Sequence, residues 1–321
     1  MFFRCFMQDN CASSLISIIS KLLGDELCSL LLEGKLDEVM LNPNGSLFVT
    51  AIGGKNSFYG TVDSSKATIA IRQLSNFSGK TIDEKSPIVE CELSKLNIRF
   101  EAILPPLVKG PVFCMRSMHA LNLDFRDLVA SNFIKETQIE LFDSFIKEKK
   151  NILICGMTGT GKTSFINSFL KRICALDTDS RITTIEDTPE LKLEAENSVS
   201  LFTNETTSIS NLVKASLRLS PMRIVIGEVR SVEALDMIDA LTTGHSGCLA
   251  SIHAGTVTQC LERLKLLVTR AQSTYQNIES MIAQAIDVVI VLKKNPYRHV
   301  SQIALVKGFE NSQYNLQFLG E

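Results

Sequence analysis

Gly156-Met157-Thr158-Gly159-Thr160-Gly161-Lys162-Thr163 decides the fold of this chain, because it matches G-x-x-x-x-G-K-T, the pattern of a phosphate-binding loop. The residues before it, 151–155, read Asn-Ile-Leu-Ile-Cys and predict a short buried strand, and a helical pattern follows from 162 to 176. Strand, glycine-rich loop and helix are the context in which this motif binds phosphate, so a chance glycine-rich turn is the weaker interpretation. The sequence therefore predicts a nucleoside triphosphate site.

The loop assigns a chemical role to individual residues. Its glycines let several backbone N–H groups face one anion. Lys162 is expected to reach the β- and γ-phosphates of ATP, and the Thr163 hydroxyl is expected to ligate Mg²⁺. The nucleotide-binding residues that we expect are Gly156, Met157, Thr158, Gly159, Thr160, Gly161, Lys162, Thr163 and Ser164.

The amino-acid composition indicates a globular protein. The chain has 321 residues, enough for two domains, and is 45% hydrophobic and 21% charged, which is typical of a globular protein. Its net charge of −2 provides no overall basic field, so we expect no direct sequence-specific binding of nucleic acid. Nine cysteines occur without a C-x-x-C pair, which favours buried thiols in a reducing compartment over disulfides or a zinc site.

No signal-peptide pattern opens the sequence, and no apolar run approaches the ~18 residues that a membrane helix needs. We therefore expect a cytoplasmic protein whose membrane association would be peripheral. Residues 15–32 have apolar side chains at helical spacing, and we expect one amphipathic helix that packs on a core. Binding of this helix to a membrane surface is the alternative, although its polar face has few Lys or Arg residues.

The pattern of elements divides the chain into two expected domains. Residues 1–120 predict a smaller N-terminal α+β domain with mostly antiparallel strands, residues 121–135 a linker, and residues 136–321 an α/β domain. In the last of these, strands alternate with helices, which predicts a mostly parallel sheet covered on both faces. The expected strands are 151–155, 181–186, 223–227, 248–252 and 287–292, and the expected helices are 162–176, 209–219, 232–243, 256–268 and 275–285.

Titratable side chains follow three of these strands, where parallel sheets bind their ligands. Glu228 stands two residues beyond an apolar run and is expected to deprotonate the attacking water or to hold Mg²⁺. Glu186 is expected to share the water or the metal, and His253 to sense the γ-phosphate. The alternatives are a helix cap for Glu228 and a core histidine for His253, whereas His245 fits either a site or a structural role.

The phosphate-binding loop and the segments that contain Glu186, Glu228 and His253 form four motifs. In this order and spacing they resemble the Walker A, Asp box, Walker B and His box of the secretion-ATPase superfamily of type II and type IV secretion and type IV pili. The likeness is greatest to the TrbB-like conjugal-transfer ATPases. It covers nearly the whole chain, and its most specific parts are Thr243-Gly-His245 and Ile252-His-Ala254. The other matching segments are 37–42, 87–90, 99–106, 113–116, 216–221 and 227–236. Thr160, Ser164, Met222 and Gly255 depart from the usual pattern.

The resemblance implies an ATPase motor with a RecA-like C-terminal domain, a mobile linker, a homo-hexameric ring and inner-membrane secretion-machine partners. It also implies that Arg99 and Arg116 of the N-terminal domain touch the nucleotide phosphates. Arg218, Arg223 and Arg230 are candidates for action across subunits. Two rival functions remain: a RecA-like nucleic-acid motor, and a scaffold that binds nucleotide without hydrolysing it.

Overall fold

The structure of this protein is a computed structural model that describes residues 2–52, 54–118, 123–271 and 277–319. The chain forms two compact units, residues 1–119 and 120–321, and each is described by itself. Within the described ranges, no helix is both long enough and apolar enough to span a lipid bilayer.

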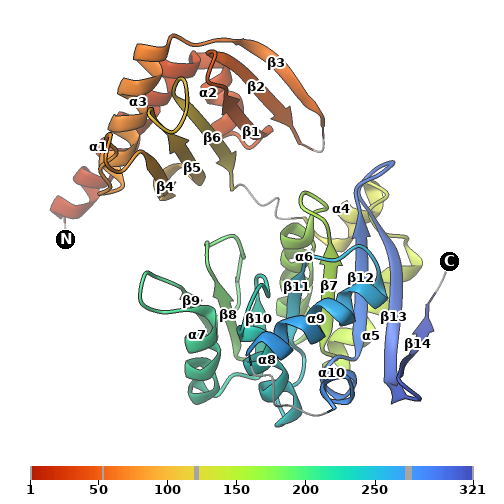
Figure 1. Cartoon of the computed structure of the whole chain (residues 1–321). Coiled ribbons are helices and arrows are strands. Elements are labelled where there is room, and N and C mark those ends of the chain that lie inside the picture. The colour runs from red at the N-terminus through yellow and green to blue at the C-terminus, as the bar shows by residue number, and fades with distance from the viewer. Residues whose placement is uncertain (1, 53, 119–122, 272–276, 320–321) are drawn as a thin grey trace. The chain divides into compact units, whose positions relative to one another are not determined.

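The first unit is an antiparallel sheet with helices packed against its core face (Figure 1). Its strand order is β3-β2-β1-β6-β5-β4. Alternate side chains of each central strand, such as Val39 of β1 and Phe100 of β5, are buried in the core. The elements are α1 (Phe2–Leu23), α2 (Asp25–Leu32), β1 (Leu36–Leu41), β2 (Ser46–Ala51), β3 (Asn56–Thr61), α3 (Ser64–Phe77), β4 (Ile88–Leu93), η1 (Ser94–Leu96), β5 (Ile98–Ile103) and β6 (Val112–Ser117).

The single helix expected over residues 15–32 is two helices, α1 and α2. Gly24 separates them with a φ of 88°, a conformation that ends a helix and that favours glycine. Asp25 and Glu26 then open α2, where their charges are favourable for the helix dipole. Apolar side chains of both helices, including Ile19 and Leu31, are buried in the core of the first unit. The structure therefore agrees with the expectation that this segment packs on a core.

The second unit is a sheet with the order β14-β13-β12-β7-β11-β10-β8-β9. Every neighbouring pair from β12 to β9 is parallel, whereas β13 and β14 are antiparallel. Its elements are α4 (Phe125–Ala130), α5 (Thr137–Lys147), β7 (Ile152–Gly156), α6 (Lys162–Leu176), β8 (Ile182–Glu186), β9 (Ser198–Phe202), α7 (Ile209–Ser216), η2 (Leu217–Leu219), β10 (Arg223–Ile226), α8 (Glu233–Thr242), β11 (Leu249–Ile252), α9 (Val257–Ala271), α10 (Ile278–Ala285), β12 (Val288–Lys293), β13 (His299–Glu310) and β14 (Gln313–Phe318).

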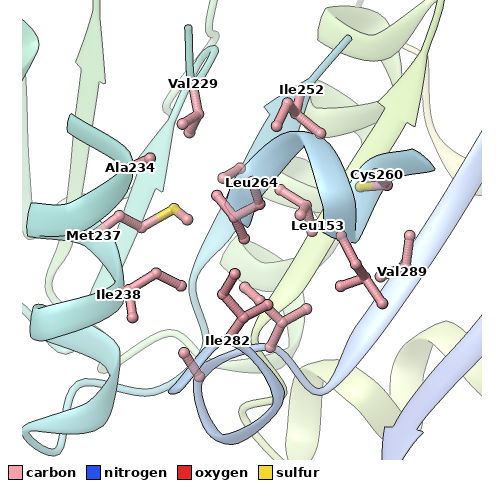
Figure 2. Close-up of a cluster of buried hydrophobic side chains, with 14 of the residues drawn as sticks. Leu153, Val229, Ala234, Met237, Ile238, Ile252, Cys260, Leu264, Ile282 and Val289 are labelled. Atoms are coloured by element: carbon pink, nitrogen blue, oxygen red, sulfur yellow. The ribbon is translucent and has the colours of Figure 1, made fainter. Parts of the chain in front are cut away.

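Two hydrophobic cores lie on opposite faces of this sheet, because consecutive strand residues point to opposite sides. In β7, Ile152 and Ile154 belong to the core that contains the phenylalanines of α4, α5 and α6. Leu153 and Cys155 belong to the core formed with α7 to α10. Figure 2 shows this second cluster, with Leu264 of α9 and Ile282 of α10 packed toward the sheet. The expected α/β architecture with helices on both faces is confirmed.

The sequence did not indicate every element. Within the expected linker, residues 125–130 form α4, whose start is capped by reciprocal contacts of Asp124 and Asp127. Strands β9, β13 and β14 were not expected, because their side chains are less regularly buried than those of the central strands; β9 and β14 are the two edge strands of the sheet. The beginning of the helix expected at 275–285 lies outside the described residues, and α10 begins at Ile278.

A buried ion pair ties the start of β10 to neighbouring helices. The Arg223 side chain is 2% exposed, and its guanidinium donates to Asp177 Oδ2 over 2.6 Å and to the Ile146 carbonyl over 2.8 Å. Burial raises the pKa of Asp177, but hydrogen bonds from Ser180 and Arg223 outweigh it, so this pKa lies below its ordinary value. Arg223 is therefore a structural residue.

We expect Arg223→Ala to lower the free energy of unfolding by about 2–4 kcal/mol, because it removes a buried side chain and leaves the half-buried Asp177 carboxylate and the Ile146 carbonyl without their donor. Chemical denaturation followed by circular dichroism measures this change. Lys214→Ala is the matched control, since Lys214 is 64% exposed in its pair with Asp236 and should contribute about 0–1 kcal/mol. Equal losses in the two variants would contradict the structural role of Arg223.

Candidate active site

The candidate site lies where the parallel strands of the second unit end. Strands β7, β11, β10 and β8 are direct neighbours in that order, so their carboxyl ends lie along one edge of the sheet (Figure 1). The phosphate-binding loop follows β7, and His253 follows β11. Glu228 follows β10, and Glu186 is the last residue of β8.

Close contacts and backbone conformation favour glycine at several positions of the loop after β7. A Cβ atom on Gly156 would lie 2.4 Å from Thr160 Oγ1 and 3.0 Å from the Leu292 carbonyl oxygen. Gly161 has a φ of 94° and precedes the first residue of α6, Lys162. The tight turn thus ends at the N-terminus of a helix, whose free N–H groups and dipole favour a phosphate.

Lys162, His253 and Glu228 form a continuous polar chain at the mouth of this loop. Lys162 Nζ donates to the Gly156 carbonyl over 3.0 Å and lies 3.3 Å from His253 Nδ1. His253 Nε2 lies 2.6 Å from Glu228 Oε1. Because an ammonium group can only donate, Nδ1 must accept, and the neutral imidazole carries its proton on Nε2, facing Glu228. Three strand ends are therefore connected through side chains.

Burial and neighbouring charges set the protonation states in this chain. Burial lowers the pKa of Lys162, and the Glu228 carboxylate opposes that shift. Burial also lowers the pKa of His253, and the Lys162 charge adds to the effect, while Glu228 acts in the opposite direction. His253 is thus favoured in its neutral form, whose Nδ1 can accept from Lys162 while Nε2 lies close to the Glu228 carboxylate.

Arg230 extends the chain on the far side of Glu228. Its Nε donates to Glu228 Oε2 over 2.7 Å, and its Nη1 lies 3.5 Å from Asp187 Oδ2. Asp187 in turn accepts a hydrogen bond from the Thr203 hydroxyl over 3.0 Å. Arg230 therefore contacts the site of its own chain, so the loop after β8 and the loop after β10 are held together.

Glu186 is placed beside these groups but is engaged with backbone. It is 4% exposed, and its Oε1 accepts from the backbone N–H groups of Glu190 and Leu191 over 3.0 and 2.8 Å. A Cβ atom on Gly227 would lie 3.2 Å from Glu186 Cγ, so the side chain packs directly against the start of the Glu228 loop. Its contacts fix the loop that carries Asp187.

The residues present fit ATP with Mg²⁺. Gly159 and Gly161 have positive φ values, the loop ends at the N-terminus of α6, whose free N–H groups favour an anion, and Lys162 supplies a positive charge. Mg²⁺ is usually held by one or two protein oxygens, nucleotide phosphates and water. Thr163 and Glu228 would be those protein ligands. Across the residues that the structure describes, no cluster of three His, Cys, Asp or Glu side chains forms a separate metal cage.

The remaining candidates belong to other elements of the two units. Arg99 of β5 and Arg116 of β6 are direct cross-strand neighbours in the first unit, where they pair with Glu90 and Glu38. Burial excludes Arg223 as a residue that reaches another subunit, whereas Arg218 is exposed. His245 precedes β11 at the opposite edge of the sheet from His253, and its Nδ1 lies 3.2 Å from the Ala240 carbonyl at the end of α8.

Two residues that touch the phosphate-binding loop were missed from the sequence. Arg298, between β12 and β13, donates from Nε to the Gly159 carbonyl over 2.9 Å. The ring of Phe133 would lie 3.3 Å from a Cβ atom on Gly161. Neither belongs to a motif, but Arg298 follows the strand expected at 287–292, so the parallel topology could have placed it at this edge.

Comparison with known proteins agrees with this architecture. The family described as type II/IV secretion system protein matches residues 65–303. The conjugal transfer protein TrbB of Rhizobium radiobacter is 34% identical over 296 residues, which cover 92% of this chain and 91% of the relative. The probable conjugal transfer protein TrbB of Sinorhizobium fredii is also 34% identical, over 94% of this chain and 93% of its own.

A solved structure supports the fold. The ATPase DotB of Legionella pneumophila aligns with a TM-score of 0.61 at 18% identity, covering 86% of this chain and 78% of its own. The match of one family over most of the chain, together with relatives that share a third of their residues over nearly their full length, leads to one assignment. The chain belongs to the type II/IV secretion system protein family, on the branch of the conjugation and type IV secretion ATPases.

Proposed function

We propose that this protein hydrolyses ATP to ADP and phosphate and uses the reaction to drive a type IV secretion or conjugation machine. The observation that carries the proposal is the polar chain from Lys162 through His253 to Glu228 at the mouth of the phosphate-binding loop. It joins a phosphate-binding cation to a candidate general base. The two TrbB relatives support the link to conjugal transfer.

Hydrolysis needs a positioned water and neutralisation of charge on the γ-phosphate. In the proposal, Lys162 exchanges its contact with the Gly156 carbonyl for the β- and γ-phosphates. Glu228 takes the proton of the attacking water as the new P–O bond forms and the bond to the β-phosphate oxygen breaks. Mg²⁺, held by Thr163 and Glu228, would neutralise charge on the phosphate oxygens. Glu186 assists by fixing the adjacent loop.

His253 connects nucleotide state to the position of Glu228. When ATP draws Lys162 to the phosphates, His253 Nδ1 loses its donor while Nε2 stays beside the carboxylate. The resulting change in hydrogen bonding is local, and it can shift the equilibrium between two arrangements of the surrounding loops. We therefore assign His253 the role of sensor of the γ-phosphate.

Arg99 and Arg116 complete the proposal as phosphate contacts from the first unit. Both are paired with carboxylates, so binding of a phosphate would require exchange of one anionic partner for another. ATP contact with both units would favour a closed arrangement, and loss of the γ-phosphate would release it. We further propose a homo-hexamer that acts in the cytoplasm on inner-membrane components of the machine.

Release of phosphate by the purified protein, measured with ATP in the presence of Mg²⁺, tests the proposed ATP hydrolysis. Mass photometry with and without the nucleotide tests the ring. Absence of hydrolysis in an assembled, ATP-bound ring would support the non-hydrolysing scaffold instead. Strong stimulation of hydrolysis by DNA, lost at high salt, would support the nucleic-acid motor.

A further inference from the structure

The loop between β12 and β13 lies on the other side of the phosphate-binding loop from His253. Strand β7 has β11 on one side and β12 on the other, and both neighbours are parallel to it. Residues 294–298, which follow β12, therefore emerge at the same edge as the phosphate-binding loop. No motif or proposed catalytic step has used this segment so far.

Two contacts join this segment and its surroundings to the phosphate-binding loop. Arg298 Nε donates to the Gly159 carbonyl over 2.9 Å, whereas Lys294 Nζ comes only within 3.8 Å of the place where a Cβ on Gly159 would stand and makes no contact with the glycine itself. At the next glycine, the Phe133 ring packs against Gly161. Val300 at the start of β13 donates to the Phe133 carbonyl over 2.8 Å, which links the two supports to each other.

The Arg298 contact acts on the least constrained part of the loop. Gly159 has a φ of 75° and lacks a side chain, so its backbone has more accessible conformations than any other residue would have. A hydrogen bond from a charged donor to its carbonyl restricts the adjoining peptide groups to one orientation. A cradle that is ordered before binding loses less entropy when it takes up a phosphate.

We infer that Arg298 is a positioning residue of the nucleotide site, which acts through the Gly159 carbonyl and strengthens binding of the β- and γ-phosphates. The inference rests on the proposed function and adds to it a residue from outside the four motifs. Arg298 touches the loop and is assigned no contact with the reacting atoms.

The test compares Arg298→Ala with Lys294→Ala. Both remove one positive charge from the same segment, but Arg298→Ala alone removes the hydrogen bond to Gly159. We expect Arg298→Ala to weaken ADP binding and to raise the KM for ATP by about three- to tenfold, the effect of a partly exposed charged hydrogen bond, with kcat within about twofold. Lys294→Ala should change either constant by less than about twofold.

Displacement of a fluorescent ADP analogue measures affinity in the full-length protein, and steady-state phosphate release separates KM from kcat. Arg298→Lys retains a charged donor and should recover part of the lost affinity. If Arg298→Ala does not fold, the comparison of Arg298→Lys with the wild type tests the inference instead. The melting temperature without nucleotide should stay within about 2 °C of wild type, since the contact is on the surface.

Two results would overturn the inference. Equal losses of affinity in Arg298→Ala and Lys294→Ala would show that only the general positive charge matters. Wild-type affinity in Arg298→Ala would show that Gly159 needs no support. Failure of the proposed function can be distinguished from failure of this inference. If the protein had no nucleotide site at this loop, Lys162→Ala would bind ADP with wild-type affinity.

Discussion

Glu228→Gln is expected to lower kcat by about 10²–10⁴-fold while leaving ATP bound, which is the range for loss of general base catalysis. The amide is nearly isosteric with the carboxylate and keeps one oxygen that can accept from Arg230 Nε, but its NH₂ group cannot accept from His253 Nε2. It cannot accept a proton from water. Phosphate release under saturating ATP, together with binding of a fluorescent ATP analogue, measures the two effects separately.

Glu190→Gln is the matched control for that experiment. It makes the same chemical change on the neighbouring loop, where Glu190 contacts Glu186 through its backbone N–H group. We expect kcat of this variant to stay within about twofold of wild type, since its carboxylate has no assigned step. Hydrolysis at the wild-type rate in Glu228→Gln would refute its role as base.

Lys162→Ala should weaken ATP binding by at least about 30-fold, as expected when one partner of a buried charge pair is removed. The pKa of Lys162 is already lowered by burial, so the unliganded protein keeps this charge in an unfavourable place. A bound phosphate would compensate that cost, and the alanine variant loses the compensation. Titration of a fluorescent ATP analogue measures the loss.

Lys171→Ala is the control for Lys162→Ala, because both residues belong to α6. The Lys171 side chain is 38% exposed and lies 4.0 Å from Asp124, so its removal should change affinity by less than about twofold. If Lys162→Ala bound ATP as tightly as the wild type, the nucleotide site itself would be misplaced.

Much of the second unit could be predicted, because local sequence and tertiary environment agree there. Apolar runs such as Ile152–Cys155 are short and continuous, as in strands buried on both faces, and α6 spans the expected residues, 162–176. Strand β13 and the edge strand β14 could not be predicted in the same way. Their half-exposed faces leave no regular pattern, and their pairing depends on β12.

The same difference between local and long-range information applies to the residues of the candidate site. Glu228, Glu186 and His253 could be proposed as site residues from the sequence because each lies at or just beyond the end of a recognisable strand, and parallel topology brings strand ends together. No local pattern indicated that Glu186 would bind backbone N–H groups, that Arg230 would pair with Glu228, or that Arg223 would be buried. Such contacts depend on side-chain directions across strands that are far apart in the chain.

By itself, the sequence determined the glycine-rich loop motif, the alternation of strands and helices, and the strand ends at which the candidate site lies. These follow from glycine conformation, hydrophobic periodicity and strand direction, all of which act over a few residues. Only the tertiary structure decided that His253 stands between Lys162 and Glu228, and that Arg298 supports Gly159. Those contacts join residues dozens of positions apart, and only packing of the sheet fixes their distances.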